Sequence, residues 1–422
     1  MNGRISRVEA KRLIYGLSLA SIVVYINLYL MQGMLPMLSE RFMLGGGESS
    51  LVLSVTSFSL AFSLLGFALA SDAIGRFRPM MLALWLLALS NPLMLLIESW
   101  HGFLGLRLIQ GVLLAAVPAI AMAFLRERLP LAALIKAAAF YIAANSFGGI
   151  VGRLLGGAMA QHLDWQGSVL ALSLLTLLAV AVCHLLLRPA ADSGRHRVRE
   201  TKPWRGFALH LGRAELRLLY LLGGLAFMVM VNQFSFIQLH LLKTPFEWSR
   251  FEVTLIFLCY LSGTLSAYRS AAVVARLGVM GLFCASLLLM VAGSLLTLID
   301  TAPAIIGGFL MTACGFFLIH ACCNSQVALK ATGHRAKASA LYLCCYYLGA
   351  ALGGPFLMPF WQQGGWGGVV AGSLLLLGVA ALVMYRLGRR LAADSAPKPE
   401  ITAQDEPSGA VLPLAEPGCK AC

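Results

Sequence analysis

The chain has 422 residues, of which 59% are hydrophobic and only 12% are charged, and its formal net charge at pH 7 is +14. Soluble domains carry about 25% charged residues, so this composition excludes a soluble globular protein and indicates an integral membrane protein. The apolar runs are continuous rather than alternating, which excludes a membrane β-barrel and predicts an all-α fold.

The first apolar run follows four basic residues in the segment MNGRISRVEAKRLIYG. It is too long for a signal-peptide core and has no cleavage site, so we expect it to remain as the first membrane helix. A spanning helix needs about 20 apolar residues, and runs of this length predict twelve spans. Their ranges are 13–37, 50–71, 79–97, 102–125, 135–160, 167–187, 216–241, 252–274, 277–299, 303–327, 337–361 and 366–387.

The segment 136–157 is repeated without a gap at 337–358, and the match continues beyond it. The identical pairs are Lys136/Lys337, Ala137/Ala338, Ala139/Ala340, Tyr141/Tyr342, Gly148/Gly349, Gly152/Gly353, Gln161/Gln362, Trp165/Trp366, Gly167/Gly368 and Val169/Val370. A repeat of this length indicates two copies of one unit. The twelve helices are therefore predicted to form two six-helix bundles related by pseudo-two-fold symmetry.

Four segments follow from this division. Residues 1–187 and 216–390 are the two six-helix halves, and residues 188–215 are an Arg-rich linker between them. Residues 391–422 are rich in Pro and acidic-tinged, which predicts a disordered tail.

The basic residues are distributed unequally between the two sides of this topology. Of the 32 Lys and Arg residues, 27 lie on the side of the termini and the linker, three lie on the opposite side and two lie within spans. The positive-inside rule then places both termini and the linker in the cytoplasm. The charge is a topology signal that also suits an anionic inner leaflet, so no nucleic-acid partner is expected. We expect a monomeric, multi-pass protein in the lipid bilayer of the bacterial inner membrane.

The loop between spans two and three reads ALASDAIGRFR at 68–78. Gly75 permits a tight turn, Asp72 can cap or pair at a helix end, and the arginines stay at the cytoplasmic surface. The loop resembles the G-x-L-x-D-r-x-G-r-r signature of the major facilitator superfamily, with alanine at the usual glycine and first arginine positions. The resemblance implies that Asp72, Gly75 and Arg76 form a latch between the halves. A plain polar turn is the alternative.

Span four contains the motif RLIQGVLLAA, which begins at Arg107 and is similar to the R-x-x-q-G-x-g-a-A element of the same superfamily. Gly111 and Ala115 form a small-xxx-small face for close helix contact. Arg107 lies one to two turns into the span, where it either lines the cavity or extends to the interface. The resemblance implies a role for Arg107 in proton coupling.

Span five carries Arg153 among glycines, in a pattern that resembles the glycine-rich element of drug:proton antiporters, with Arg153 at the usual proline position. An arginine in mid-span costs about 2.5–3.5 kcal/mol on insertion scales, so it must face a partner, water or substrate. A structural role and a role in anion binding or coupling both remain open. The glycines expected at close helix contacts are Gly111, Gly148, Gly152, Gly156, Gly349, Gly353 and Gly354.

All eighteen acidic residues lie in loops, helix ends, the linker or the tail. Cation-coupled transporters commonly use an intramembrane carboxylate, so proton coupling here needs another carrier. Histidine titrates near neutral pH, and His320 in span ten is the best placed, with hydrogen-bonded packing as the alternative. The candidates for proton coupling or gating are Asp72, Gly75, Arg76, Arg107, Arg153 and His320.

Spans one and seven begin the two halves and hold most of the polar side chains expected to line a substrate cavity. Polar groups in hydrocarbon are costly unless they face a cavity or a partner, and hydrogen bonding between helices is the alternative. Aromatic rings with neutral amides suit an uncharged or weakly anionic organic molecule. The candidates are Tyr25, Asn27, Tyr29, Gln32, Gln110, Asn145, Asn232, Gln233, Phe236 and Gln238.

The motifs of an enzyme or a metal site are missing from the sequence, with no phosphate loop, His-rich metal spacing or nucleophile elbow. We therefore expect neither a cofactor nor a metal. We expect an ion gradient, namely of protons, to supply the energy for transport. The resemblance covers residues 10–388 and is to bacterial drug-efflux and arabinose-efflux-like permeases. It implies the major facilitator fold and proton-driven export of a small organic compound by alternating access. Uptake or facilitated passage of a metabolite, or a non-transporting sensor, remain as alternatives.

Overall fold

The computed structural model describes residues 7–45, 47–187 and 204–395. Within these ranges the regular structure is helical and contains no strand, which confirms the predicted all-α class. The first half contains α1 (Arg7–Gly33), α2 (Leu35–Arg41), η1 (Glu48–Ser50), α3 (Leu51–Ile74), α4 (Phe77–Ser90), η2 (Pro92–Leu96), α5 (Trp100–Leu114), α6 (Ala116–Arg128), α7 (Leu131–His162) and α8 (Trp165–Leu187). The second contains α9 (Arg205–Gly212), α10 (Ala214–Leu241), α11 (Glu252–Leu255), η4 (Ile256–Cys259), α12 (Tyr260–Tyr268), α13 (Ser270–Leu296), α14 (Ala302–Lys330) and α15 (Arg335–Ser395).

These elements supply the twelve predicted spans. Ten of the described helices are long and apolar enough to cross a membrane, and Glu252–Tyr268 is a shorter apolar helix. The backbone of α15 breaks at Gly365 (φ 54, ψ −138), so this helix contains two spans. Gly278 (φ 70, ψ 172) divides α13 in the same way, between the eighth and ninth spans. Such positive φ values favour glycine, since it has no Cβ.

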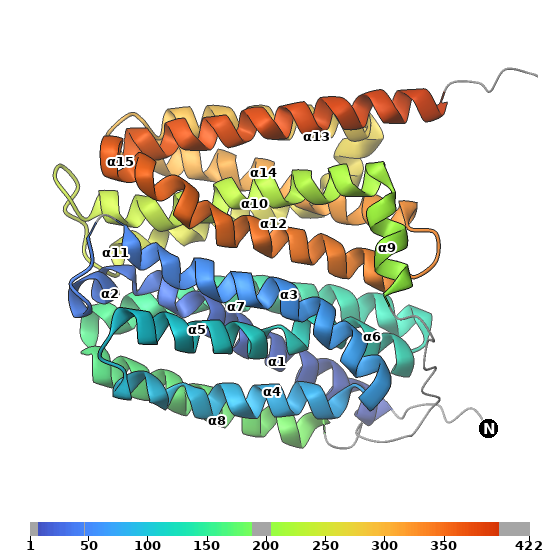
Figure 1. Cartoon of the computed structure of the whole chain (residues 1–422), viewed down its shortest axis with the longest axis horizontal. Helices are drawn as coiled ribbons and strands as arrows, with labels where there is room; N and C mark the ends of the chain where they lie inside the picture. Colours follow the sequence, from blue (N-terminus) through green and yellow to red (C-terminus); the bar gives the residue numbers. More distant parts are fainter. Residues whose placement is uncertain (1–6, 46, 188–203, 396–422) are drawn as a thin grey trace, which may run out of the picture.

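The two halves lie side by side as separate groups of helices. In Figure 1, α1–α8 occupy the lower part of the molecule and α10–α15 the upper part. The pairing of α1 with α7 in the first half is matched by that of α10 with α15 in the second. Between the halves, α3 packs on α15, and α7 packs on α11 and η4. The repeat found in the sequence thus appears as the same helix pair in each half.

Glycines bring the paired helices close together. An added Cβ at Gly148 or Gly152 of α7 would lie 2.9 Å from the Cα of Ile22 or Ile26 in α1. Gly349 of α15 is likewise against the backbone of α10. Only small residues permit backbones to approach in this way, so the repeated glycines specify the two helix crossings.

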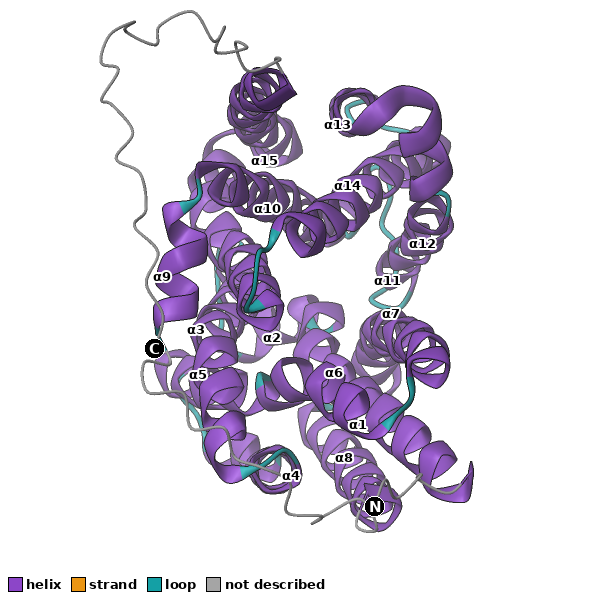
Figure 2. Cartoon of the chain, turned by 90° about the vertical axis from the view of Figure 1, so that its right-hand side faces the viewer, coloured by secondary structure: helices purple, strands orange, loops and turns teal. Residues whose placement is uncertain are grey.

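The ends of some elements differ from those predicted. The first span ends at Gly33, and α2 starts anew at Leu35 with Pro36 in its first turn, because proline has no N–H with which to continue the hydrogen bonds of α1. The second part of the predicted linker 188–215 contains α9, which packs on α10 and α15 (Figure 2). Helix α15 continues to Ser395, inside the range 391–422 predicted as a disordered tail, and the rest of that range lies outside the described residues.

Candidate functional site

Arg153 lies at the interface of the two halves, inside a cage of aromatic rings. Its side chain projects from α7 and is only 2% exposed. The guanidinium carbon is 3.7 Å from the ring centre of Tyr29 in α1, 4.7 Å from that of Tyr260 in α12 and 4.9 Å from that of Phe257 in η4. Such contacts are cation–π interactions. One face of the cage therefore comes from the first half, and the other comes from the second.

The hydrogen bonds of Arg153 go to neutral acceptors. Its Nε donates to Gln32 Oε1 at 2.8 Å, Nη1 donates to the carbonyl of Gly149 at 2.8 Å, and Nη2 donates to the Tyr260 hydroxyl at 3.4 Å. Across the described ranges, no ion pair joins Arg153 to an Asp or Glu. The side chain thus faces protein at the interface rather than lipid.

A second arginine crosses the interface in the opposite direction. Arg250, at the start of the second half's α11 segment, pairs with Glu40 at the end of α2, and its Nη1 donates to the carbonyl of Ala160 in α7 at 3.1 Å. Nearby, Gln32 Nε2 donates to Ser235 Oγ in α10 at 2.7 Å. These contacts hold the halves together at the end of the molecule that the sequence places outside the cell.

Phenol side chains from both halves meet at the interface. The hydroxyl oxygens of Tyr25 in α1 and Tyr347 in α15 are 3.0 Å apart. Tyr25 stacks on Tyr29 with ring centres 6.1 Å apart, and Tyr346 packs edge-on against Tyr347 at 5.2 Å. Tyr25 and Tyr346 are only half-buried. Of the predicted cavity residues, the structure thus brings Tyr25, Tyr29 and Gln32 together beside Arg153, whereas Tyr346, Tyr347 and Tyr260 were not anticipated.

His320 in α14 lies beside this tyrosine group. Its Nδ1 is 2.9 Å from the hydroxyl of Tyr342, and its ring centre is 4.7 Å from that of Tyr346 and 5.9 Å from that of Phe316. The imidazole therefore lies next to the interface and shares a hydrogen bond with the Tyr342 hydroxyl. This arrangement allows either proton transfer or simple packing.

Arg107 lies in a different place, inside the first half. It is fully buried, and donates to Gln110 Oε1 at 2.7 Å, to Thr56 Oγ1 at 3.2 Å and to the carbonyl of Asn27 at 3.3 Å. Asn91 joins the same network, donating to Asn27 Oδ1 at 2.8 Å and accepting from Gln110 at 3.0 Å. Asn27 and Gln110, predicted to line the cavity, form hydrogen bonds between helices here, which is the alternative that the sequence left open. Asn91 and Thr56 were not predicted.

The remaining polar candidates also hydrogen-bond to neighbouring backbone or side chains. Asn145 in α7 accepts from Ser21 in α1. Asn232 donates to the carbonyl of Ala350 at 3.3 Å, and Gln233 donates to Ser294 Oγ at 2.9 Å. For the two candidates nearer the end of α10, Gln238 donates to the carbonyl of Phe234 at 3.1 Å, and Phe236 packs on Trp361 with ring centres 5.7 Å apart.

The loop motif between α3 and α4 forms a cluster of charges. Arg76 Nη1 lies 2.6 Å from Asp72 Oδ1, and Arg76 Nη2 lies 2.8 Å from Glu127 Oε1 at the end of α6. Burial lowers the pKa of Arg76, but Glu127 and Asp72 outweigh it, so that this pKa is raised above its ordinary value. Gly75 has φ 94, which the tight turn requires. In this conformation the described partners of Arg76 are all in the first half, and Glu127 was not anticipated.

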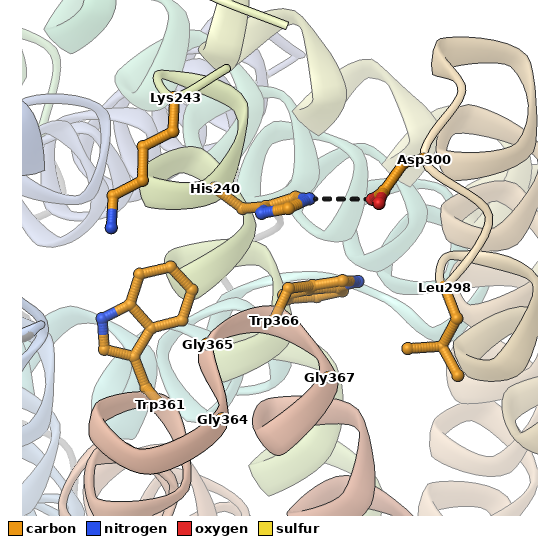
Figure 3. Close-up of a pocket in the computed structure, with 9 residues that line it drawn as sticks. All are labelled: His240, Lys243, Leu298, Asp300, Trp361, Gly364, Gly365, Trp366 and Gly367. Carbon is orange, nitrogen blue, oxygen red and sulfur yellow. Dashed lines mark hydrogen bonds and ion pairs between the residues drawn. The ribbon is translucent and has the colours of Figure 1, made fainter. Parts of the chain in front are cut away.

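A hollow lies at the predicted outer end of the second half (Figure 3). Its volume is about 420 Å³. His240, whose Nε2 is 3.3 Å from Asp300 Oδ1, stacks on the ring of Trp366, and Lys243 lies over the ring of Trp361. The hollow does not include Arg153 or the tyrosine group. Within the described chain, no group of three His, Cys, Asp or Glu side chains is placed to hold a metal ion.

Comparison with known proteins connects the chain to one family. The model of the Major Facilitator Superfamily matches residues 17–354. The chain is 34% identical over 375 residues to the inner membrane transport protein YnfM of Escherichia coli (strain K12), covering 88% of this chain and 89% of that protein. It is 31% identical over 366 residues to the uncharacterized MFS-type transporter YybF of Bacillus subtilis (strain 168), covering 86% and 90%.

Solved structures share the fold at low sequence identity. The nucleoside transporter NupG superimposes with a TM-score of 0.69 and 12% identity, covering 92% of this chain and 99% of that one. A bacterial homologue of the human lysosomal transporter Spinster, in an inward-facing and occupied conformation, gives a TM-score of 0.72 and 16% identity, covering 92% and 99%.

Proposed function

The chain belongs to the major facilitator superfamily and is a multi-pass membrane transporter, and from this premise we propose that it exports a small organic compound by proton antiport with alternating access. Transporters of this kind bind their substrate near the bilayer midplane, between the two halves. We place it in the bacterial inner membrane with both termini in the cytoplasm, which the distribution of basic residues supports.

The observation that carries this proposal is the joined interface around Arg153. Side chains of both halves meet there, in the Arg153 cage and in the Tyr25–Tyr347 contact. At the predicted outer end, Arg250 and Glu40 hold the halves together. A site that both halves complete, next to a closure at one end, is what rocking of two rigid bundles requires.

Proton coupling is assigned to His320, with Asp72 as the second candidate. His320 is half-buried beside the tyrosine group and hydrogen-bonds to Tyr342. A proton that arrives at the imidazole removes its capacity to accept a hydrogen bond from Tyr342, so protonation rearranges the tyrosine group and competes with substrate binding there. The described hydrogen bonds of Arg107, by contrast, all stay within the first half.

The test is proton-coupled flux in inverted vesicles, whose cytoplasmic face points outward. Respiration acidifies the interior, and a pH-sensitive dye then reports proton release as small aromatic acids, amides, amines and pentoses are added in turn. At least one compound is expected to accumulate and to release protons, and the variant His320→Gln should lose the proton release. Accumulation that survives a protonophore contradicts antiport.

The same vesicles separate the alternatives. Accumulation in right-side-out vesicles, driven by an acidic exterior, would identify an uptake symporter, and equal flux in both directions without a gradient would identify a facilitator. Binding without any flux would identify a sensor. Each of these outcomes contradicts proton-driven export.

A further inference from the structure

The guanidinium of Arg153 is a buried charge that the described part of the protein leaves without an anion. Its acceptors are a glutamine amide, a backbone carbonyl and a phenol. Among the described residues, the buried side chains include Arg107, Arg153 and Lys337, but no Asp or Glu. The formally charged side chains that are buried in the described chain are therefore cationic, and Arg153 is the member of this set that lies at the interface.

Neutral partners do not fully compensate a buried cation. Removing an ion from water costs more than a few cation–π contacts and neutral hydrogen bonds return. A carboxylate does compensate it, because the fork of N–H groups on a guanidinium matches the two carboxylate oxygens. The charge thus favours a ligand of opposite sign and disfavours cationic compounds.

The cage around Arg153 is divided between the halves. Tyr29 and Gln32 belong to the same half as Arg153, whereas Phe257 and Tyr260 belong to the other. When the halves move apart at this end, Arg153 loses its ring contacts with Phe257 and Tyr260 and its hydrogen bond to the Tyr260 hydroxyl. The side of the guanidinium that these residues covered then opens to the interface. An anionic ligand stabilises Arg153 most in this open state, because the guanidinium has then lost part of its neutral partners.

We propose that the transported compound is an organic carboxylate, and that its carboxylate binds Arg153 while its flat apolar part lies among the interface tyrosines. Ring faces and hydroxyl groups suit such a body, and Tyr25 and Tyr346 are the half-buried members of the group. This inference rests on the proposed transport function, whose substrate class it names.

The experiment compares matched acids and amides on the purified, full-length protein. Benzoate, phenylacetate and indole-3-acetate are each paired with their primary amide, which keeps size and shape but removes the charge, and benzylammonium serves as the cation. Binding is measured by titration calorimetry. At least one acid should bind more than tenfold tighter than its amide, and benzylammonium should bind more weakly than either.

Variants then locate the preference. Arg153→Gln should weaken binding of that acid by about 10–100-fold, the usual value of a charge-assisted hydrogen bond, and leave binding of the amide unchanged. Arg153→Lys should lie between, since it keeps the charge without the fork. Lys243→Gln is the matched control, because it removes the same charge from an exposed position, and it should retain the preference.

Two results overturn the inference: no acid preferred over its amide by the wild-type protein, or a preference that persists unchanged in Arg153→Gln. If Arg153→Gln does not fold, a preference in Arg153→Lys equal to that of the wild type overturns it instead. Proton-coupled export of an amide or amine, with no acid bound, contradicts the anion assignment but not export. Acid binding at Arg153 without proton-coupled flux contradicts export but not the anion site.

Discussion

At the scale of single residues, the two arginines within the spans illustrate two ways of keeping a buried charge. Arg107 has three hydrogen-bond acceptors in its own half, whereas Arg153 shares its aromatic cage with the other half. The partners of a charge held within one rigid bundle stay in place when the halves move, whereas the partners of a charge shared across an interface depend on the relative position of the halves. We therefore expect the two arginines to respond to different measurements.

The Arg107 network predicts a loss of stability on substitution. In Gln110→Leu, both Arg107 and Asn91 lose a hydrogen-bond partner, and a buried polar group left without its partner costs about 1–3 kcal/mol. The thermal unfolding midpoint in detergent should fall, whereas Gln363→Leu, at an exposed position, should leave it unchanged. Equal midpoints for wild type and Gln110→Leu would contradict the assigned network.

The sequence identified which polar residues are buried but not what they face. Asn27 and Tyr25 are two positions apart in α1, yet Asn27 bonds within the first half and Tyr25 contacts the second. Because the spans are apolar on every side, periodicity does not distinguish a face toward the interface from one toward a neighbouring helix. The partner rings Phe257 and Tyr260 lie in an apolar segment, where nothing in the sequence pattern marks an aromatic residue as a contact of Arg153.

At the scale of elements, the glycines of the repeated segment determine how closely helices cross. Gly349 of α15 has the backbone of Gly224 in α10 directly against it, whereas Gly66 of α3 has no atom near the position of a Cβ. Gly349→Ala should therefore destabilise the protein by about 1–3 kcal/mol through overpacking. Gly66→Ala should be neutral or stabilising, since alanine favours helix. Thermal unfolding of the two variants checks this, and equal midpoints would show that the crossing tolerates a methyl group.

Helix α9 predicts a dependence of stability on pH. His210 lies on the buried face of α9, with Nε2 3.3 Å from the carbonyl of His334, and burial lowers its pKa below the ordinary value of about 6.5. The unfolded chain then binds a proton more readily, so this contribution to stability is complete above pH 6.5 and is lost as the pH falls toward the folded-state pKa.

Unfolding midpoints measured at pH 7.5 and pH 5.5 test this sign. The wild type should lose more stability on acidification than His210→Gln, which cannot take up the proton. The exposed His101 provides the control, since His101→Gln should keep the wild-type difference. The same difference in wild type and His210→Gln would show that α9 does not carry the effect.

Elements differ in how far the sequence specifies them. The spans and their glycine crossings follow from apolar runs and from the repeat, because both are local patterns. Helices α2 and α9 are short, and their positions depend on packing: the buried face of α2 includes Leu35 and Leu38, and α9 packs through Phe207. Short helices gain most of their stability from tertiary contacts. The sequence pattern therefore did not separate the start of α2 from the first span, or α9 from the linker.

At the scale of the whole molecule, the duplicated sequence accounts for the arrangement of two similar bundles. It does not specify how they meet, since Arg250, Glu40 and Ala160 lie in loops or at helix ends far apart in the chain. In the structure these residues hold the predicted outer end, and the Arg153 cage lies further in. Alternating access requires that this closed end is one of two states of the transporter.

Distances between spin labels on the two halves test this claim without knowledge of the substrate. In a background in which the native cysteines are replaced and activity is retained, one pair of labels is placed at Arg41→Cys and Lys243→Cys, at the predicted outer end. A second pair is placed at Arg126→Cys and Leu329→Cys, at the predicted cytoplasmic end, and all four positions are exposed. We predict that lowering the pH, or adding a compound that binds, lengthens the outer distance while it shortens the cytoplasmic one. A single unchanged distance at each end under every condition would contradict alternating access.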